Sequence, residues 1–121
     1  MPQITIEYSA NLAGRFDARG FAARLHGHLV AHADAQMESC KTRLVRLDEV
    51  VIGAGEPHRA MIHADVRILT GRSDEQKRLL GEAAIQSLED AVGGAKGLEV
   101  QLTVEVRELD RANYHKRVVS S

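Results

Sequence analysis

Residues 59–76 have the sequence RAMIHADVRILTGRSDEQ, which carries two structural signals in succession. In its first part apolar and polar side chains alternate, with the period of a half-buried strand. The apolar face carries Ala60, Ile62, Ala64, Val66 and Ile68, and the other face carries Arg59, Met61, His63, Asp65 and Arg67. Ser73 and Gln76 then have the spacing of a capping box, with Asp74 and Glu75 placed at the positive end of the helix dipole. This stretch therefore predicts a strand followed directly by a helix.

The residues that follow complete a strand-helix-strand unit. Apolar residues recur at helical spacing from Leu79 to Ala91, and Gly93-Gly94 follows, as glycine often does just past a helix C-terminus. Residues 98–107 then alternate again between apolar and polar side chains. The polar tail at 110–121 shows no such period.

The first half of the chain shows the same order of elements. Ile4, Ile6 and Tyr8 alternate with polar residues and predict a strand. Helical spacing of apolar residues runs from Asp17, a plausible N-cap, to Asp34. A second strand is expected over 40–51, and Gly53–Pro57 is the clearest turn in the chain.

These elements predict an α/β (α+β) fold over a single domain, 1–121, made of two pseudo-repeats at about 1–55 and 56–121. Strand-helix-strand units favour parallel strand pairs with right-handed crossovers. The short Gly53–Pro57 link should make the second and third strands antiparallel neighbours or nearly so. We expect a four-stranded mixed sheet with both helices on one face. The opposite face would be solvated or covered by other copies of the chain.

Composition narrows the class of protein. The chain is 44% hydrophobic and 27% charged with a formal net charge of −1, which suits one globular domain and gives no basic excess for nucleic acid. It has no apolar stretch long enough to span a bilayer and no signal-peptide pattern at its start. Cys40 is the only cysteine, so an intrachain disulfide is excluded, and we expect a buried structural thiol. We predict a cytoplasmic protein with no membrane or nucleic-acid partner.

Histidines raise the question of a metal site. His28 and His32 lie four residues apart on the first predicted helix, with His26 nearby. This spacing can bind zinc, but no Cys, Asp or Glu completes a recognised ligand set. We expect a solvated helix face, and interpret His63 on the third strand as an interface or near-site residue.

Three short motifs point to one family. Met1-Pro2 leads directly into a strand, Lys41-Thr42-Arg43-Leu44 opens the second strand, and Leu69-Thr70-Gly71-Arg72-Ser73 precedes the second helix. In order and spacing they resemble the 5-carboxymethyl-2-hydroxymuconate isomerase family of the tautomerase superfamily, over nearly the whole chain. The resemblance implies a tautomerase-like fold, a homotrimer, and an isomerase that uses no metal or organic cofactor. It also implies a small dicarboxylic or tricarboxylic acid as substrate. Pro2 would be the catalytic base after removal of Met1, and Arg43 and Arg72 would bind substrate carboxylates.

The chemistry of these residue types agrees with that implication. Proline at the N-terminus is a secondary amine, whereas elsewhere its nitrogen is an amide that cannot accept a proton. An α-amino group has a pKa of about 7.7–8.0. An apolar pocket and nearby arginines lower this pKa, so the free base is populated at neutral pH. Arginine also binds a carboxylate through two parallel hydrogen bonds.

Several alternatives stay open from the sequence. Arg46 could face the site in place of Arg43, and His63 could act as a general acid. The substrate could be another small keto or enol acid. The chain could also be a trimeric binding or structural protein that keeps the fold without catalysis.

Overall fold

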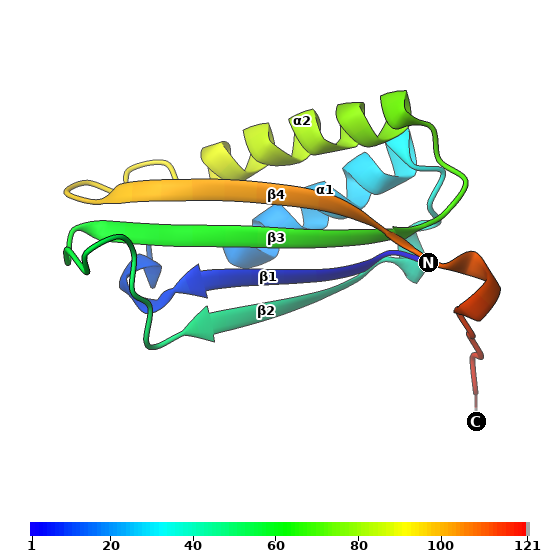
Figure 1. The fold of residues 1–121 in the computed structure, drawn as a ribbon, viewed down its shortest axis with the longest axis horizontal. Helices are drawn as coiled ribbons and strands as arrows, with labels where there is room; N and C mark the ends of the chain where they lie inside the picture. The colour runs from blue at the N-terminus through cyan, green and yellow to red at the C-terminus, as the bar shows by residue number, and fades with distance from the viewer. Residues whose placement is uncertain (121) are drawn as a thin grey trace.

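The computed structural model describes residues 1–120, which form a four-stranded sheet with both helices on one face (Figure 1). The strands and helices are β1 (Gln3–Ser9), α1 (Ala18–His32), β2 (Lys41–Leu47), β3 (Arg59–Leu69), α2 (Asp74–Ala91) and β4 (Glu99–Leu109). Short 3-10 helices occupy Ala10–Leu12, Met37–Ser39 and Arg111–Asn113. The predicted fold, two successive β-α-β units forming one mixed sheet, is confirmed.

The strand order is β2-β1-β3-β4. β1 pairs parallel with β2, β3 pairs parallel with β4, and β1 and β3 are antiparallel at the centre of the sheet. The second and third strands run antiparallel, as predicted, but β1 lies between them, so they are not neighbours. β2 also ends at Leu47 and not at Val51, which leaves residues 48–58 as the link. This longer link crosses the end of β1.

Both helices begin at the predicted caps. A side-chain oxygen of Asp17 accepts a hydrogen bond of 3.1 Å from the backbone N–H of Gly20. Ser73 and Gln76 form the reciprocal bonds of a capping box, at 3.1 and 2.9 Å. Each cap contributes about 1 kcal/mol to helix stability. No helix in residues 1–120 is long and apolar enough to cross a lipid bilayer.

The core lies between the sheet and the helices. Ile4, Ile6 and the apolar face of β3 point toward the helices and are buried. The helices contribute the buried residues Phe21, Leu25, Leu29, Leu80, Ala84 and Leu88. The other face of β1 and β3 carries polar side chains that are half-buried or exposed, including Thr5, Glu7, His63 and Arg67. The alternation of the sequence therefore predicted correctly which residues of these strands form the core.

Candidate active site

The N-terminus lies at one end of the sheet, where several segments meet. Figure 1 shows that β3 ends, β4 ends and the C-terminal segment begins at this same end. The Pro2 side chain is fully buried, and its carbonyl oxygen accepts a hydrogen bond of 3.3 Å from the backbone N–H of Lys41. This bond extends the parallel pairing of β1 and β2 by one residue, so Lys41, at the start of β2, lies directly beside the chain terminus.

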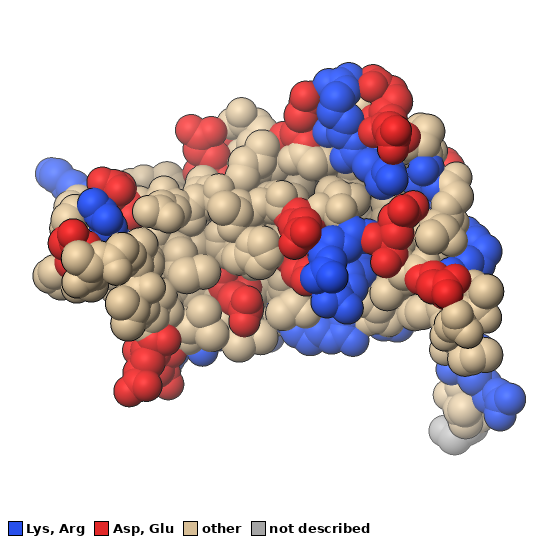
Figure 2. Space-filling view, in the orientation of Figure 1, with Lys and Arg blue, Asp and Glu red and all other residues tan. Residues whose placement is uncertain are grey.

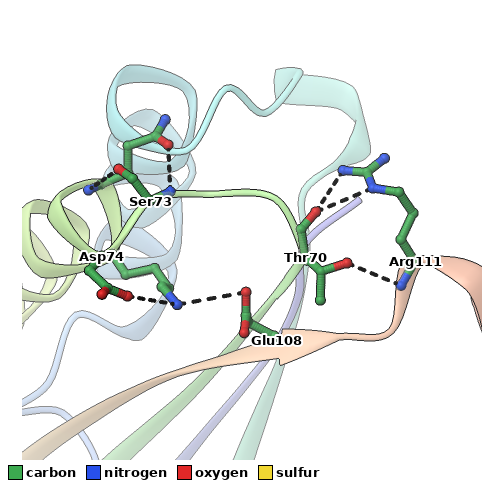
Figure 3. Close-up of polar contacts among 7 residues, drawn as sticks. Thr70, Ser73, Asp74, Glu108 and Arg111 are labelled. Atoms are coloured by element: carbon green, nitrogen blue, oxygen red, sulfur yellow. Dashed lines mark hydrogen bonds and ion pairs between the residues drawn. The ribbon is translucent and has the colours of Figure 1, made fainter.

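Arg72 comes to this end from the turn between β3 and α2. Gly71 before it has a φ of 113°, a left-handed conformation that glycine adopts at little cost, and Ser73 after it caps α2. Figure 3 shows this turn from Thr70 to Asp74. The Arg72 Nε donates a hydrogen bond of 2.8 Å to the carbonyl oxygen of Ala33, the residue that follows α1. This bond ties the α1 C-terminus to the turn and uses one of the guanidinium's five N–H donors.

Cations from three segments lie near enough to the terminal amine to act on its charge. Burial lowers the pKa of the N-terminal amine, at Met1, from its ordinary value of 8.0, and the positive charges of Arg72, Lys116 and Lys41 lower it further. The neighbouring thiol of Cys40 acts in the opposite direction. This environment favours an uncharged amine, which is the form that can accept a proton.

Arg43 lies on the outer face of the sheet, opposite Thr5 in the pairing of β1 with β2. It lines a hollow of about 370 Å³ with Gln3, Thr5, Arg67, Leu109 and Tyr114. Arg46 is opposite Tyr8, toward the other end of β1, and pairs with Asp48 at 3.5 Å. Of the two arginines on β2, Arg43 is therefore the one at the N-terminal end.

Sequence reasoning missed two residues near the terminus. Lys41 opens a motif that was recognised, but its place beside Pro2 depends on the register of β1 with β2. Lys116 belongs to the tail, which has no periodicity, and no pattern in the sequence assigned this residue a role. The Lys41 Nζ donates a hydrogen bond of 2.9 Å to the carbonyl oxygen of Ser39, and the Lys116 Nζ donates one of 3.3 Å to the hydroxyl of the same residue.

Lysine and arginine side chains are concentrated at this end of the molecule. In Figure 2 most of the visible lysine and arginine side chains lie in the half that contains the N-terminus and the C-terminal segment. Many are paired with carboxylates, such as Lys77 with Asp74 and Glu108. Within residues 1–120, no carboxylate lies within salt-bridge distance of Lys41, Arg72 or Lys116. These three cations are therefore suited to an anionic ligand.

His26 and His28 on α1 do not lie on a solvated face, which corrects the sequence-based expectation for these two residues. His26 shares a hydrogen bond of 2.7 Å with Thr42, and His28 shares one of 2.6 Å with the buried Ser87. Both rings are therefore half-buried against the sheet or α2. In the described part of the chain, no three His, Cys, Asp or Glu residues are grouped so that they could hold a metal ion.

Two further residues have defined places. On the outer face, the Nδ1 of His63 shares a hydrogen bond of 2.7 Å with the hydroxyl of Thr103. In the strand register His63 lies opposite Glu7, which is about 16 Å along β1 from Pro2 at a rise of about 3.3 Å per residue. It is thus remote from the terminus of its own chain. Cys40 is a buried free thiol, as predicted, and burial raises its pKa.

Known proteins share both the sequence pattern and the fold. The sequence model for 5-carboxymethyl-2-hydroxymuconate isomerase matches residues 2–119. The structure of a 5-carboxymethyl-2-hydroxymuconate isomerase from Deinococcus radiodurans R1 is 29% identical, with a TM-score of 0.85, and the match covers 96% of this chain and 88% of that one. No curated protein gives a significant sequence match.

Two more distant structures show the fold alone. A 5-carboxymethyl-2-hydroxymuconate delta-isomerase is 19% identical, with a TM-score of 0.74 and coverage of 98% of this chain and 89% of that one. A fused 4-OT, described as a wild-type symmetric trimer, is 23% identical, with a TM-score of 0.69 and coverage of 93% and 89%.

Proposed function

The chain belongs to the 5-carboxymethyl-2-hydroxymuconate isomerase family and is an isomerase, and from this we propose that it ketonises a 2-hydroxymuconate-type dienol bearing two or three carboxylates. The observation that supports this most is the position of the terminal amine, which is partly buried at the sheet end near Arg72, Lys41 and Lys116. A proton-accepting amine and unpaired cations are the two features that such a reaction requires.

The base in this proposal is the nitrogen of Pro2, freed by removal of Met1. With Met1 attached this nitrogen is an amide and cannot accept a proton. Removal of Met1 also opens the space that this residue occupies near Arg72. The new amine would share the burial and the neighbouring cations that lower the pKa of the present terminus.

The reaction moves one proton within the substrate. The Pro2 nitrogen accepts the proton of the enol hydroxyl, and the oxygen becomes a ketone as the double bonds shift. The same nitrogen then returns the proton to the carbon at the far end of the diene. One O–H bond breaks and one C–H bond forms, so no other reactant is consumed. The ketone of the product is conjugated with the remaining double bond.

Arginines would stabilise the negative charge. Arg72 retains guanidinium N–H groups beyond the one bonded to Ala33, and we assign it to a substrate carboxylate or to the developing enolate oxygen. Arg43 is assigned to a second carboxylate, because its hollow also contains Gln3, the residue next to Pro2.

We further propose that the chain forms a homotrimer. The outer face of the sheet carries half-buried polar side chains and no covering element in residues 1–120. The related fused 4-OT is described as a symmetric trimer. Light scattering coupled to size-exclusion chromatography would then give three times the chain mass, whereas a monomeric mass would contradict this part of the proposal.

The proposed function is tested by following the ultraviolet absorbance of dienols as they ketonise. We expect rapid turnover of 2-hydroxymuconate-type dienols and at least tenfold slower turnover of a dienol monoacid. Equal rates for the monoacid would argue for a tautomerase of another enol acid. Absence of turnover above the uncatalysed rate for every dienol would overturn the proposal.

A further inference from the structure

The C-terminal segment after β4 is fastened across the end of the sheet. Arg111 makes three hydrogen bonds to Thr70: its Nε and Nη2 donate to the carbonyl oxygen at 3.2 and 3.0 Å, and its backbone N–H donates to the hydroxyl at 3.4 Å. Figure 3 shows this clamp beside the turn that leads to Ser73. Residues beyond Arg111 are therefore held close to the N-terminus.

Two side chains beyond this clamp reach the segments around Pro2. The Gln3 Nε2 donates a hydrogen bond of 2.9 Å to the hydroxyl of Tyr114. The Lys116 Nζ donates to the hydroxyl of Ser39, a buried residue, at 3.3 Å. Gln3 follows Pro2, and Ser39 lies two residues before Lys41. The segment 110–116, which we call the strap, thus bridges the starts of β1 and β2.

Lys41 and Lys116 meet at the same residue. Ser39 accepts one hydrogen bond from each lysine, through its carbonyl oxygen and its hydroxyl. Each bond uses one of the three N–H donors of an ammonium group, and neither partner carries a charge that would neutralise it. With Arg72 from the β3–α2 turn, three segments of the chain place three unpaired cations around one terminus.

We propose that Lys116, carried by the strap, is a specificity-determining residue that binds a third substrate carboxylate. This inference rests on the proposed function, because it assigns a third anionic group to the same site. Arg72 and Arg43 are assigned to the first two carboxylates, and Lys116 comes from the C-terminal segment of the chain. A substrate with three carboxylates would then be preferred over one with two.

The critical variant is Lys116→Met, which keeps an apolar stem of similar length and removes the charge. Arg117→Met is its matched control, since it removes the same charge from the next residue, which is exposed. Lys116→Arg keeps a positive charge at this position. The measured quantity is the kcat/KM for a tricarboxylate dienol divided by the kcat/KM for a dicarboxylate dienol. We expect Lys116→Met to lower this ratio about tenfold, which is at the lower end of the effects of losing a hydrogen bond to a charged group, because the site is near the surface. Arg117→Met and Lys116→Arg should leave that ratio within about twofold of wild type.

A binding measurement separates this inference from the proposed function. Isothermal titration of propane-1,2,3-tricarboxylate and of glutarate requires no catalysis. Tighter binding of the tricarboxylate by wild type, reduced in Lys116→Met and retained in Arg117→Met, would support the strap as a carboxylate site even if no dienol were turned over. Equal affinity of wild type for the two acids, or equal losses in the two variants, would overturn the inference even if the enzyme ketonises dienols.

Discussion

Arg72 and Ala33 are joined by a 2.8 Å hydrogen bond from the guanidinium Nε to the carbonyl oxygen of the residue that follows α1. The residue assigned to substrate binding is therefore also part of the fold. Its position depends on two helices at once, because Ser73, the next residue, caps α2. A substitution at Arg72 should affect both stability and activity, and the two effects can be separated.

Arg72→Met removes the guanidinium, while Arg72→Lys keeps a positive charge but loses the Nε donor. We expect each variant to lose about 1 kcal/mol of unfolding free energy, because the Ala33 carbonyl loses its partner. Activity should differ: Arg72→Lys should retain more kcat/KM than Arg72→Met, by about tenfold. Urea unfolding and steady-state kinetics measure the two quantities. Unchanged stability in both variants would contradict the structural role.

Gly71 sets the conformation of the turn that presents Arg72. Its φ of 113° is unfavourable for any residue with a Cβ. Gly71→Ala should therefore cost about 1 kcal/mol or more and lower kcat/KM by displacing Arg72.

Gly81 provides the control for this substitution. It lies in α2, where an added Cβ would make an ordinary contact of 3.8 Å with Val106. Gly81→Ala should stabilise the protein by about 0.5–1 kcal/mol and leave kcat/KM unchanged. Thermal and urea unfolding of the two variants should move in opposite directions, and a shift in the same direction would refute the argument.

Activity should depend on pH through the terminal amine. Burial and then the charges of Arg72, Lys116 and Lys41 lower the pKa of the amine at Met1. We expect the same surroundings to lower the pKa of the Pro2 amine once Met1 is removed, so that its free base persists below pH 8.0. The kcat/KM should fall as the pH decreases through that lowered pKa, since the protonated amine cannot accept a proton. Removing a neighbouring cation raises the pKa, so the acidic limb should move to higher pH in Arg72→Met and, by less, in Lys116→Met. A limb that stays in place in both variants would count against an amine base at this position.

His28 should make stability depend on pH. Burial, followed by the charges of His32 and Arg24, lowers the pKa of His28 from its ordinary value of 6.5. Below the pKa of the unfolded state, about 6.5, the unfolded chain protonates this histidine more readily than the folded protein does. The contribution of His28 to folding stability is therefore fully present above this pH and is lost as the pH falls below it. The stability of wild type relative to His28→Asn should therefore decrease between pH 7.5 and 5.5. A pH-independent difference in urea midpoint would contradict this.

Local patterns in the sequence predicted most of the fold. The strict alternation in residues 59–68 and the capping box at Ser73 are local features that tertiary packing preserved. The end of β2 was predicted wrongly, because Val50-Val51-Ile52 continues the apolar pattern although Val51 is 83% exposed in the loop. Local composition could not reveal that this loop crosses the end of β1.

The site was harder to predict because its residues come from distant segments. The choice between Arg43 and Arg46 needs the register of β1 with β2. Lys116 needs the clamp of Arg111 on Thr70, a contact between residues 41 positions apart. The roles of Pro2, Arg43 and Arg72, and the cytoplasmic location, remain predictions.

The central claim is that a free Pro2 nitrogen is the base, and the most direct test compares kcat/KM for two forms of the protein on one dienol diacid. The first begins at Pro2, as verified by intact mass. The second carries one alanine inserted before Pro2, which keeps the proline nitrogen in a peptide bond. We predict that the inserted form has a kcat/KM lower by about 100-fold or more, the usual contribution of a positioned base. Equal activity of the two forms would contradict the account.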